Sequence, residues 1–421
     1  MRNPLRGSVI ALIAALAPAR AWADPPRVAF VEALRRASTT HPTVTAARLA
    51  ITRAAALTVQ SRALLLPTVT LNATYTRLDD DRRLNDRVIL GVDQFSANVQ
   101  VTAPLYNARA WAALHRAEDA VDLARASLDE ARRASAVAAA RAWLTVSSQH
   151  RIVATSERAL ANAVAHREFA EARLQGGVGN RLDAVRAAQD VAAVRMSLAA
   201  QRAALARSQE SLGVIAGADE ALDAVDDIDP AAVTDLPGAL DALPRRADLR
   251  ALEARARNAD RAVAESWADY LPSLGAVFQP FYQNPASLTQ PVTGWQAQAV
   301  LTWVIFDGGA RYGQHAERRA ARDDARAQLD AALRQARAEV RGAVTAVTLA
   351  DERAAAAREA EALAQEAATL ADAAWRAGAT GNLELIDARR RERDARATAR
   401  MAEDDARQAR LDVLIALGRF P

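Results

Sequence analysis

Two carboxylates lie three residues apart near the end of the chain, at Glu384 and Asp387. They follow a short glycine-bearing segment, residues 376–381, that interrupts two long helical patterns. Residues three apart share one face of a helix, so both acids would point the same way. Carboxylates held this close repel one another, and a cation could bind between them. The alternative is that they are ordinary first-turn acids, favoured by the positive end of the helix dipole.

The same kind of segment occurs once more, 201 residues earlier in the chain. Gly177 there matches Gly378, and glycine supplies turn conformations that a helix cannot adopt. Asp183 follows in the first copy, but Arg186 stands where the second copy has Asp387. The two segments are therefore expected to be hairpin tips, of which the second is the more acidic.

The remaining polar residues show no catalytic pattern. None of the five histidines belongs to a metal-binding spacing such as H-E-x-x-H. The Gly177-Val178-Gly179 run lacks the third glycine and the preceding strand of a dinucleotide-binding loop. Serine, histidine and aspartate residues are scattered over predicted helices. We therefore expect no catalytic residues, no cofactor and no metal site.

Residues 1–23 have the pattern of a cleaved secretory signal. Two arginines precede an apolar stretch, residues 8–17, that is too short to span a bilayer, and small residues precede a cleavage site before Asp24. A retained N-terminal anchor is the alternative. The chain has no cysteine, so we expect export without disulfides and without lipid attachment. The net charge of +3 disappears with the three arginines of the signal, which removes the argument for a nucleic-acid partner.

Long helical stretches dominate the rest of the chain. Residues 108–175 contain no proline or glycine and would form about 100 Å of helix at about 1.5 Å per residue. Apolar residues recur every seven positions, which indicates supercoiled packing of helix on helix; one such series is Val191, Leu198, Leu205 and Leu212. Asn382 is placed to cap the last helix. The long helices are expected over residues 108–175, 181–216, 309–377 and 382–418, and shorter ones over 43–65 and 245–270.

Two pairs of strands interrupt the helices. Apolar and polar residues alternate within them, so each strand would have one apolar and one polar face. Pro104 is expected to end the second strand, and Gly275 and Pro280 to interrupt the third. The strands are expected over residues 68–78, 93–104, 273–283 and 294–305.

These elements form one plan that occurs twice: helix, strand, loop, strand, long helix, tip and return helix. The first repeat covers residues 24–217 and the second covers residues 245–421. Between them lies an acidic, proline-containing linker, residues 218–244, with room for one short helix.

Four strands are too few for a membrane barrel, since the smallest membrane barrels have about eight. An exposed sheet edge is not tolerated in lipid. Three copies of the chain would supply twelve strands, with twelve long helical elements below them. The predicted fold is therefore mainly α with a membrane β-barrel portion and a two-fold internal repeat. A soluble β-sandwich beside a coiled coil is the alternative.

The order of these features resembles the TolC-type outer-membrane efflux proteins over essentially the whole mature chain. The resemblance rests on the Leu-Pro steps at 66–67 and 271–272, the IFDGG segment at 305–309 and the paired tips. The first half departs from the pattern at residues 105–109, which lack the paired glycines. The linker is also short for the family. This implies a reduced equatorial domain, which in the family surrounds the middle of the helical barrel.

The resemblance implies a homotrimer with a twelve-stranded barrel in the outer membrane and a twelve-helix barrel in the periplasm. Such a trimer contacts outer-membrane lipid and is a passive exit duct for drugs, metals or secreted proteins. It docks to a periplasmic adaptor and is powered by an inner-membrane transporter. A periplasmic adaptor or a structural coiled-coil protein is the alternative. An adaptor would carry one hairpin with compact β-domains, and a filament would have no use for alternating strands.

The resemblance also assigns roles to tip residues. Acidic side chains ring the periplasmic opening in the family; the matching positions are Glu384, Asp387 and Asp183. The turns themselves touch the adaptor; the matching positions are Gly177, Val178, Gly378 and Ala379. The alternative is that the glycines only make the turn.

Overall fold

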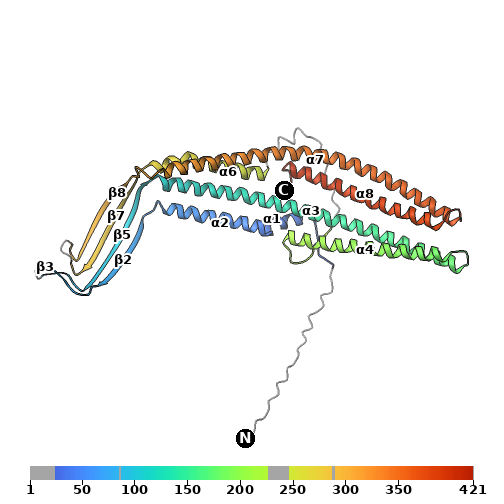
Figure 1. The fold of residues 1–421 in the computed structure, drawn as a ribbon, viewed down its shortest axis with the longest axis horizontal. Helices are drawn as coiled ribbons and strands as arrows, with labels where there is room; N and C mark the ends of the chain where they lie inside the picture. The colour runs from blue at the N-terminus through green and yellow to red at the C-terminus, as the bar shows by residue number, and fades with distance from the viewer. Residues whose placement is uncertain (1–23, 85–86, 226–245, 287–289, 421) are drawn as a thin grey trace, which may run out of the picture.

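The protein is a long rod of helices with a small sheet at one end and two helical tips at the other (Figure 1). The computed structural model describes residues 24–84, 87–225, 246–286 and 290–420. The expected signal, residues 1–23, and most of the expected linker, residues 226–244, lie outside the described residues. The tips are separated from the sheet by the length of the rod, so the two ends have independent surroundings.

The elements follow one plan twice. The first half contains β1 (Arg27–Val28), α1 (Phe30–Thr40), α2 (Pro42–Ala63), β2 (Thr68–Arg77), β3 (Arg82–Leu84), β4 (Arg87–Leu90), β5 (Asp93–Asn107), α3 (Ala108–Gln175), α4 (Arg181–Ala216) and β6 (Asp223–Ala224). The second half contains α6 (Ala247–Ala264), the 3-10 helix η2 (Glu265–Tyr270), β7 (Ser273–Asn284), β8 (Thr293–Thr302), α7 (Ala310–Arg376) and α8 (Asn382–Ala416). The prediction of a mainly helical chain is confirmed. None of the helices in the described ranges has a segment long and apolar enough to cross a membrane.

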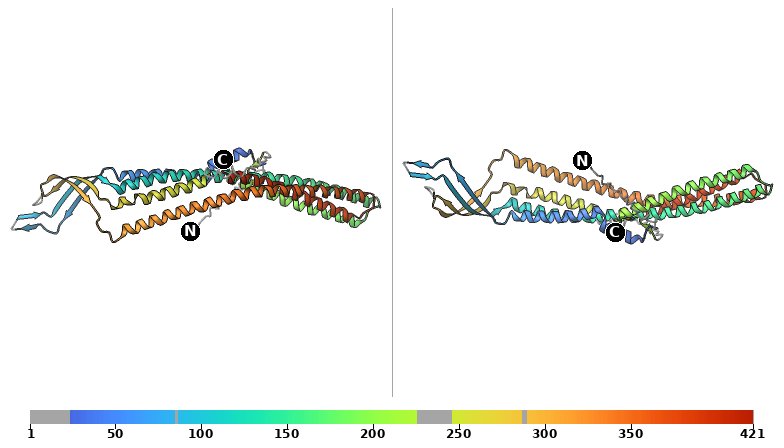
Figure 2. Two further views of the ribbon diagram at one scale, coloured as in Figure 1. Left: turned by 90° about the horizontal axis from the view of Figure 1, so that it is seen from above. Right: turned by 90° about the horizontal axis from the view of Figure 1, so that it is seen from below.

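Each long helix packs against the helix that follows it, α3 against α4 and α7 against α8. The predicted heptad packing is confirmed in α4, where Val191, Leu198 and Leu212 are buried. Between α7 and α8, Ala354 forms a buried cluster with alanines of the facing helix. Small side chains at such contacts let the helix axes approach closely. Figure 2 shows the four helices lying alongside one another over the half of the rod nearer to the tips.

The sheet at the other end has four antiparallel strands in the order β2-β5-β7-β8. Its cross-strand register places apolar residues opposite one another, as where Val69 faces Val101 and Val101 faces Phe278. The other face is polar: the side-chain amide of Asn72 donates to Asn98 at 3.2 Å. The predicted two-faced strands are therefore confirmed. Strands β2 and β8 are the outer strands of this sheet and each has one unpaired edge.

Several boundaries differ from the prediction. Strand β5 continues beyond Pro104 to Asn107, because an irregularity between Pro104 and Tyr106 restores the pairing with β7. Strand β7 is unbroken, since Pro280 has no partner on β5 and its missing N–H interrupts no pairing there. Strand β8 ends at Thr302 rather than at residue 305. The helix expected to reach Tyr270 is α-helical only to Ala264 and continues as the 3-10 helix η2.

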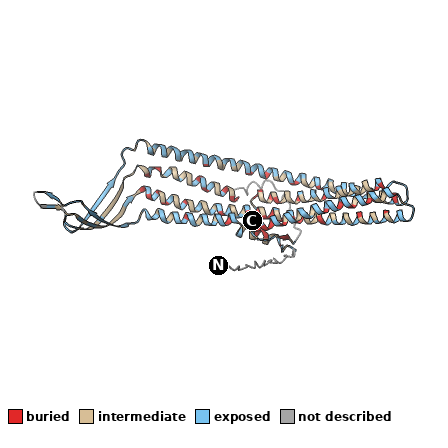
Figure 3. Ribbon diagram, turned by 60° about the horizontal axis from the view of Figure 1, so that its bottom comes forward, coloured by how far each residue is buried: buried red, intermediate tan, exposed pale blue. Residues whose placement is uncertain are grey.

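The largest apolar core lies at the middle of the rod and contains residues from near both ends of the described chain. Trp143 of α3 is fully buried there, and its indole N–H donates to the carbonyl of Val28 at 3.1 Å. Phe30 packs edge-on against Trp143, with ring centres 5.4 Å apart, and contacts Phe420 as well. Figure 3 shows buried residues along the helices and a largely exposed sheet. Within one chain, the helices bury side chains against one another, whereas both faces of the sheet are largely uncovered.

Replacing Trp143 by alanine is expected to lower the free energy of unfolding by about 3–5 kcal/mol. The change removes a buried ring and leaves the Val28 carbonyl without its donor. Denaturant unfolding of the purified protein measures the effect. Trp111→Ala removes the same atoms from a side chain of α3 that is 51% exposed, and should change stability by only about 0.5 kcal/mol. Equal losses in the two variants would contradict the position of the core.

Candidate functional site

The first tip joins α3 to α4 through residues 176–180. Gly177 has a φ of +75°, a left-handed conformation that glycine adopts without strain. The amide of Val178 donates to the carbonyl of Arg173 at 3.1 Å, which closes the end of α3. Asn180 is the N-cap of α4, and its side chain accepts a hydrogen bond from the amide of Leu182 at 3.0 Å. The first tip is thus closed by contacts within its own hairpin.

The second tip repeats the turn but not the cap. Gly378 has a φ of +77°, and the amide of Ala379 donates to the carbonyl of Ala374 at 2.8 Å. Helix α8 begins at Asn382, and Gly381 is its N-cap. The prediction that Asn382 caps α8 is therefore wrong. Glycine takes the cap position, which leaves the side chain of Asn382 available for other partners.

Asn382 joins the two tips instead. Its residue is 3% exposed, and its Nδ2 donates to the backbone carbonyl of Asp183 at 3.2 Å. Its Oδ1 lies 3.0 Å from Nε2 of His166, which is 4% exposed. Because Nδ2 is committed to a carbonyl, His166 must be the donor, so a neutral ring carries its proton on Nε2. We refer to His166, Asn382 and Asp183 as the tip link.

Aromatic rings surround the tip link. Trp375 packs edge-on against His166, at 4.9 Å between ring centres, and against Phe169, at 5.2 Å. Arg173 lies 5.1 Å from the ring centre of Trp375, and Arg376 lies 5.7 Å from that of Phe169. These contacts run between α3 and α7. Ring stacking and cation–π attraction therefore hold the two hairpins together next to the link.

Sequence reasoning missed the tip link. His166 and Asn382 are 216 residues apart, and neither belongs to a motif. The sequence does place an aromatic residue shortly before each tip glycine, Phe169 before Gly177 and Trp375 before Gly378. That pairing is the signal that would have directed attention to contacts between the tips.

The three acids expected at the aperture have different surroundings. Glu384 is exposed, and its carboxylate lies 2.8 Å from the position that a Cβ on Gly381 would take, so it turns back over the start of α8. Asp387 pairs with Arg391 at 2.6 Å. Asp183 contributes its backbone carbonyl, not its carboxylate, to the tip link. Their role as an aperture stays a prediction.

The turn residues expected to touch an adaptor are all exposed; they are Gly177, Val178, Gly378 and Ala379. A Cβ on either glycine would meet nothing within 4 Å. Both glycines are therefore required by the positive φ and not by a lack of space.

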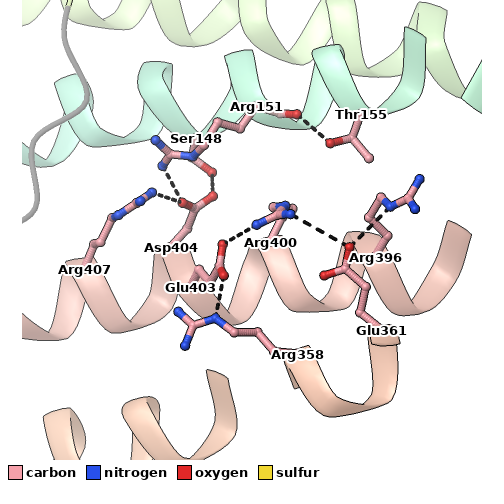
Figure 4. Close-up of polar contacts among 10 residues, drawn as sticks. All are labelled: Ser148, Arg151, Thr155, Arg358, Glu361, Arg396, Arg400, Glu403, Asp404 and Arg407. Carbon is pink, nitrogen blue, oxygen red and sulfur yellow. Dashed lines mark hydrogen bonds and ion pairs between the residues drawn. The ribbon is translucent and has the colours of Figure 1, made fainter. Parts of the chain in front are cut away.

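Away from the tips, charged side chains join the two hairpins (Figure 4). Asp404 of α8 accepts hydrogen bonds from Ser148 and Arg151 of α3. Nearer to the tips, Arg393 of α8 binds Asp190 of α4 with two hydrogen bonds, at 2.9 and 3.2 Å. Such charge-assisted pairs require a fixed geometry, so they set the register of one hairpin on the other.

Glu403 lies at the centre of a further charged group within the second hairpin (Figure 4). It accepts hydrogen bonds from Arg358 at 2.7 Å and from Arg400 at 2.8 Å. Burial alone would raise the pKa of Glu403, but the hydrogen bonds from the two arginines outweigh it and lower the pKa. The group therefore keeps its charges at neutral pH.

Replacing Asn382 by alanine is expected to increase amide hydrogen exchange at both tips. The change leaves the buried His166 donor unsatisfied, which costs about 1–2 kcal/mol, or about 5- to 30-fold in opening. Asn180→Ala is the matched control, because it removes a cap of similar worth but should affect only the start of α4. Hydrogen-exchange mass spectrometry measures both variants. An effect of Asn382→Ala that is confined to the second tip would contradict the link.

A protein-family comparison matches both halves of the chain. The family described as outer membrane efflux protein matches residues 33–218 and 240–419. Comparison with curated proteins gives no significant sequence match.

Solved structures share this fold over most of its length. The Campylobacter jejuni CmeC outer membrane channel is 15% identical, with 92% of this chain and 85% of that chain covered and a TM-score of 0.80. The outer membrane protein VceC of Vibrio cholerae is 19% identical, with 92% and 96% covered and a TM-score of 0.77. The MtrE outer membrane channel of Neisseria gonorrhoeae, in its open state, is 19% identical, with 92% and 88% covered and a TM-score of 0.74.

These matches confirm the resemblance to TolC-type channels that the sequence indicates. The family match covers both repeats, and the fold is shared from the sheet to the tips. The chain therefore belongs to the outer membrane efflux protein family.

Proposed function

We propose that three copies of this chain form a passive exit duct in the outer membrane. The duct is joined to a periplasmic adaptor and an inner-membrane transporter, and carries small molecules or secreted proteins to the outside. The chain reaches the periplasm through a cleaved signal, residues 1–23. One observation carries the proposal: the sheet has an apolar face, a polar face and two unpaired edges. The solved relatives described as outer membrane channels support it.

The unpaired edges of the sheet require more than one copy of the chain. In lipid, backbone amides and carbonyls without partners cost several kcal/mol each, so β2 and β8 need strands from neighbouring copies. Three copies provide twelve strands, which exceeds the roughly eight of the smallest barrels. The apolar face, with Val69, Val101 and Phe278, then faces lipid. The polar face, with Asn72 and Asn98, then lines a wet interior.

The long helices also have faces suited to a neighbouring copy. Helix α7 leaves Leu349, Leu363 and Leu370 exposed, at spacings that are multiples of seven. A heptad row that is not covered within the chain is suited to packing against another helix. This row supports closure of the twelve helical elements of three chains into a periplasmic barrel.

The tips are the periplasmic end of the duct in this proposal. Glu384, Asp387 and Asp183 of three chains would surround one axis and form an acidic aperture. The pairing of Asp387 with Arg391 reduces its field, which makes Glu384 the stronger contributor. The exposed turns at Gly177 and Gly378 remain open for an adaptor.

The protein is expected to be found in the outer-membrane fraction and to be extracted by detergent as a particle with three times the mass of one chain. Cell fractionation followed by native mass spectrometry tests both points. A single chain in the periplasmic fraction would overturn the proposal. Leu363→Arg combined with Leu370→Arg should reduce the yield of trimer, whereas the same change at the exposed residues Ala362 and Thr369, about 100° around the helix from the leucine row, should reduce it much less.

The acidic aperture is tested by Glu384→Gln combined with Asp387→Asn. In planar bilayers, the double variant should show weaker block by divalent cations, since loss of about 1.4 kcal/mol of attraction corresponds to about tenfold in affinity. Asp394→Asn, in an exposed side chain of the same helix, is the control and should leave the block unchanged. If divalent cations block the double variant and the unmodified protein equally, the two acids do not form an aperture and are only first-turn residues favoured by the helix dipole.

A further inference from the structure

We propose that His166 is a positioning residue for the second tip, and that acid releases this tip by adding a proton to its ring. The inference rests on the proposed function of the tips as the periplasmic aperture. The geometry that carries it is the tip link, in which His166 of α3, Asn382 of α8 and the Asp183 carbonyl of α4 form one chain of hydrogen bonds.

The tip link binds three long helices through buried side chains. Asn382 is the first residue of α8, so its position sets where that helix begins. The amide donates to α4 and accepts from α3, so loss of either partner leaves a buried polar group unpaired. A change in the His166 ring is therefore transmitted directly to the start of α8, which carries Glu384 and Asp387.

The surroundings of His166 favour its neutral form. Burial and the nearby Arg389 of α8 lower the pKa of His166, while the hydrogen bond to Asn382 raises it less. Two carboxylates also raise the pKa, Asp190 of α4 and Asp372 of α7. Both are already engaged by arginines.

The arginines paired with these carboxylates limit how far the carboxylates raise the pKa of His166. Asp190 is bound by Arg393 at 2.9 Å. Asp372 is bound by Arg389 and by Arg376, at 2.7 Å in each pair. Burial and Arg389 outweigh these contributions, since the net shift of the pKa of His166 is downward.

The direction of the pH effect follows from this shift. A released, solvated histidine has its usual pKa near 6.5, whereas the pKa of His166 in the link is lower. The proton therefore binds the released form better. The link is fully present above about pH 6.5, and its stability is lost as the pH falls below that value.

A cavity beside the link gives the proton access and the tip room to move. It has a volume of about 470 Å³ and lies between the two hairpins. His166, Phe169, Trp375 and Arg389 contribute to its wall. Rotation of the His166 ring into this space would break its bond to Asn382 without unfolding either hairpin.

Spin labels on the two tips test the inference directly, because the chain has no native cysteine. The exposed residues Gln175 and Ala377 are replaced by cysteine and labelled in the full-length assembly, which is diluted with unlabelled protein. Pulsed electron–electron double resonance then reports the distance between the tips. Between pH 7.5 and 5.5, the ratio of released to linked tips should rise by up to about tenfold. Carboxylic side chains ordinarily titrate near pH 4 and stay ionised over this range.

Three variants separate His166 from other titrating groups. His166→Gln places an uncharged amide donor near the same acceptor, so the distance at pH 7.5 should persist and the response to acid should disappear. His115→Gln, near the sheet, should keep the full response. Asn382→Asp supplies a carboxylate that pairs with the protonated ring but removes the donor to the Asp183 carbonyl, so the tips should already be partly released at pH 7.5 and acid should not release them further.

The outcomes distinguish this inference from the proposed function. An unmodified protein whose distances do not change between pH 7.5 and 5.5 would overturn it, as would an undiminished response in His166→Gln. Conductance of the unmodified protein at pH 7.5 tests the duct separately. Conduction with a pH-independent tip distance would refute only the role of His166.

Discussion

The close packing of each long helix on its return helix is the interaction on which the rest of the molecule depends. Apolar residues at seven-residue spacing, with alanine between them, let α3 lie on α4 and α7 lie on α8 over the half of the rod nearer to the tips. This packing makes each hairpin a stiff unit. The contacts between the hairpins differ along the rod: at its middle they include the apolar core around Trp143 and Leu411, whereas toward the tips they include ion pairs, hydrogen bonds and ring contacts at separate points. The tips can therefore shift against each other at a small cost compared with opening either hairpin.

Charge at the interface between the hairpins is carried by a restricted set of residues. The chain contains no lysine, so every basic partner of the carboxylates is an arginine or a histidine. Guanidinium groups stay charged at all physiological pH values and bind carboxylates with two parallel bonds, as Arg393 binds Asp190. The buried His166 is the exception at the tips. The interface thus combines arginine contacts that keep their charge with one histidine contact that we propose to be sensitive to pH.

The sequence specified the scaffold because its signals are local and repeated. Seven-residue spacing predicted the helix packing, and strict alternation predicted the two-faced sheet. The effect of proline on the strands was predicted less well, since Pro104 is accommodated by an irregular pairing of β5 with β7, a strand from the other half, and Pro280 has no partner on β5 whose pairing it could interrupt. The tip link was missed for the same reason. Asn382 has the local character of an N-cap, but its partners lie about half the chain away and became visible only when the tips were placed side by side.

The difference between the two N-caps bears on the history of the chain. Asn180 and Gly381 occupy equivalent positions in the two repeats. A chain that arose by duplication begins with two identical tips, so both tips initially make the same contacts and have the same function. Exchange of one cap between an asparagine side chain and a glycine preserves the helix at a cost of a few tenths of a kcal/mol. A nearly neutral change of this kind lets one descendant tip diverge from its sister while the inherited scaffold is kept.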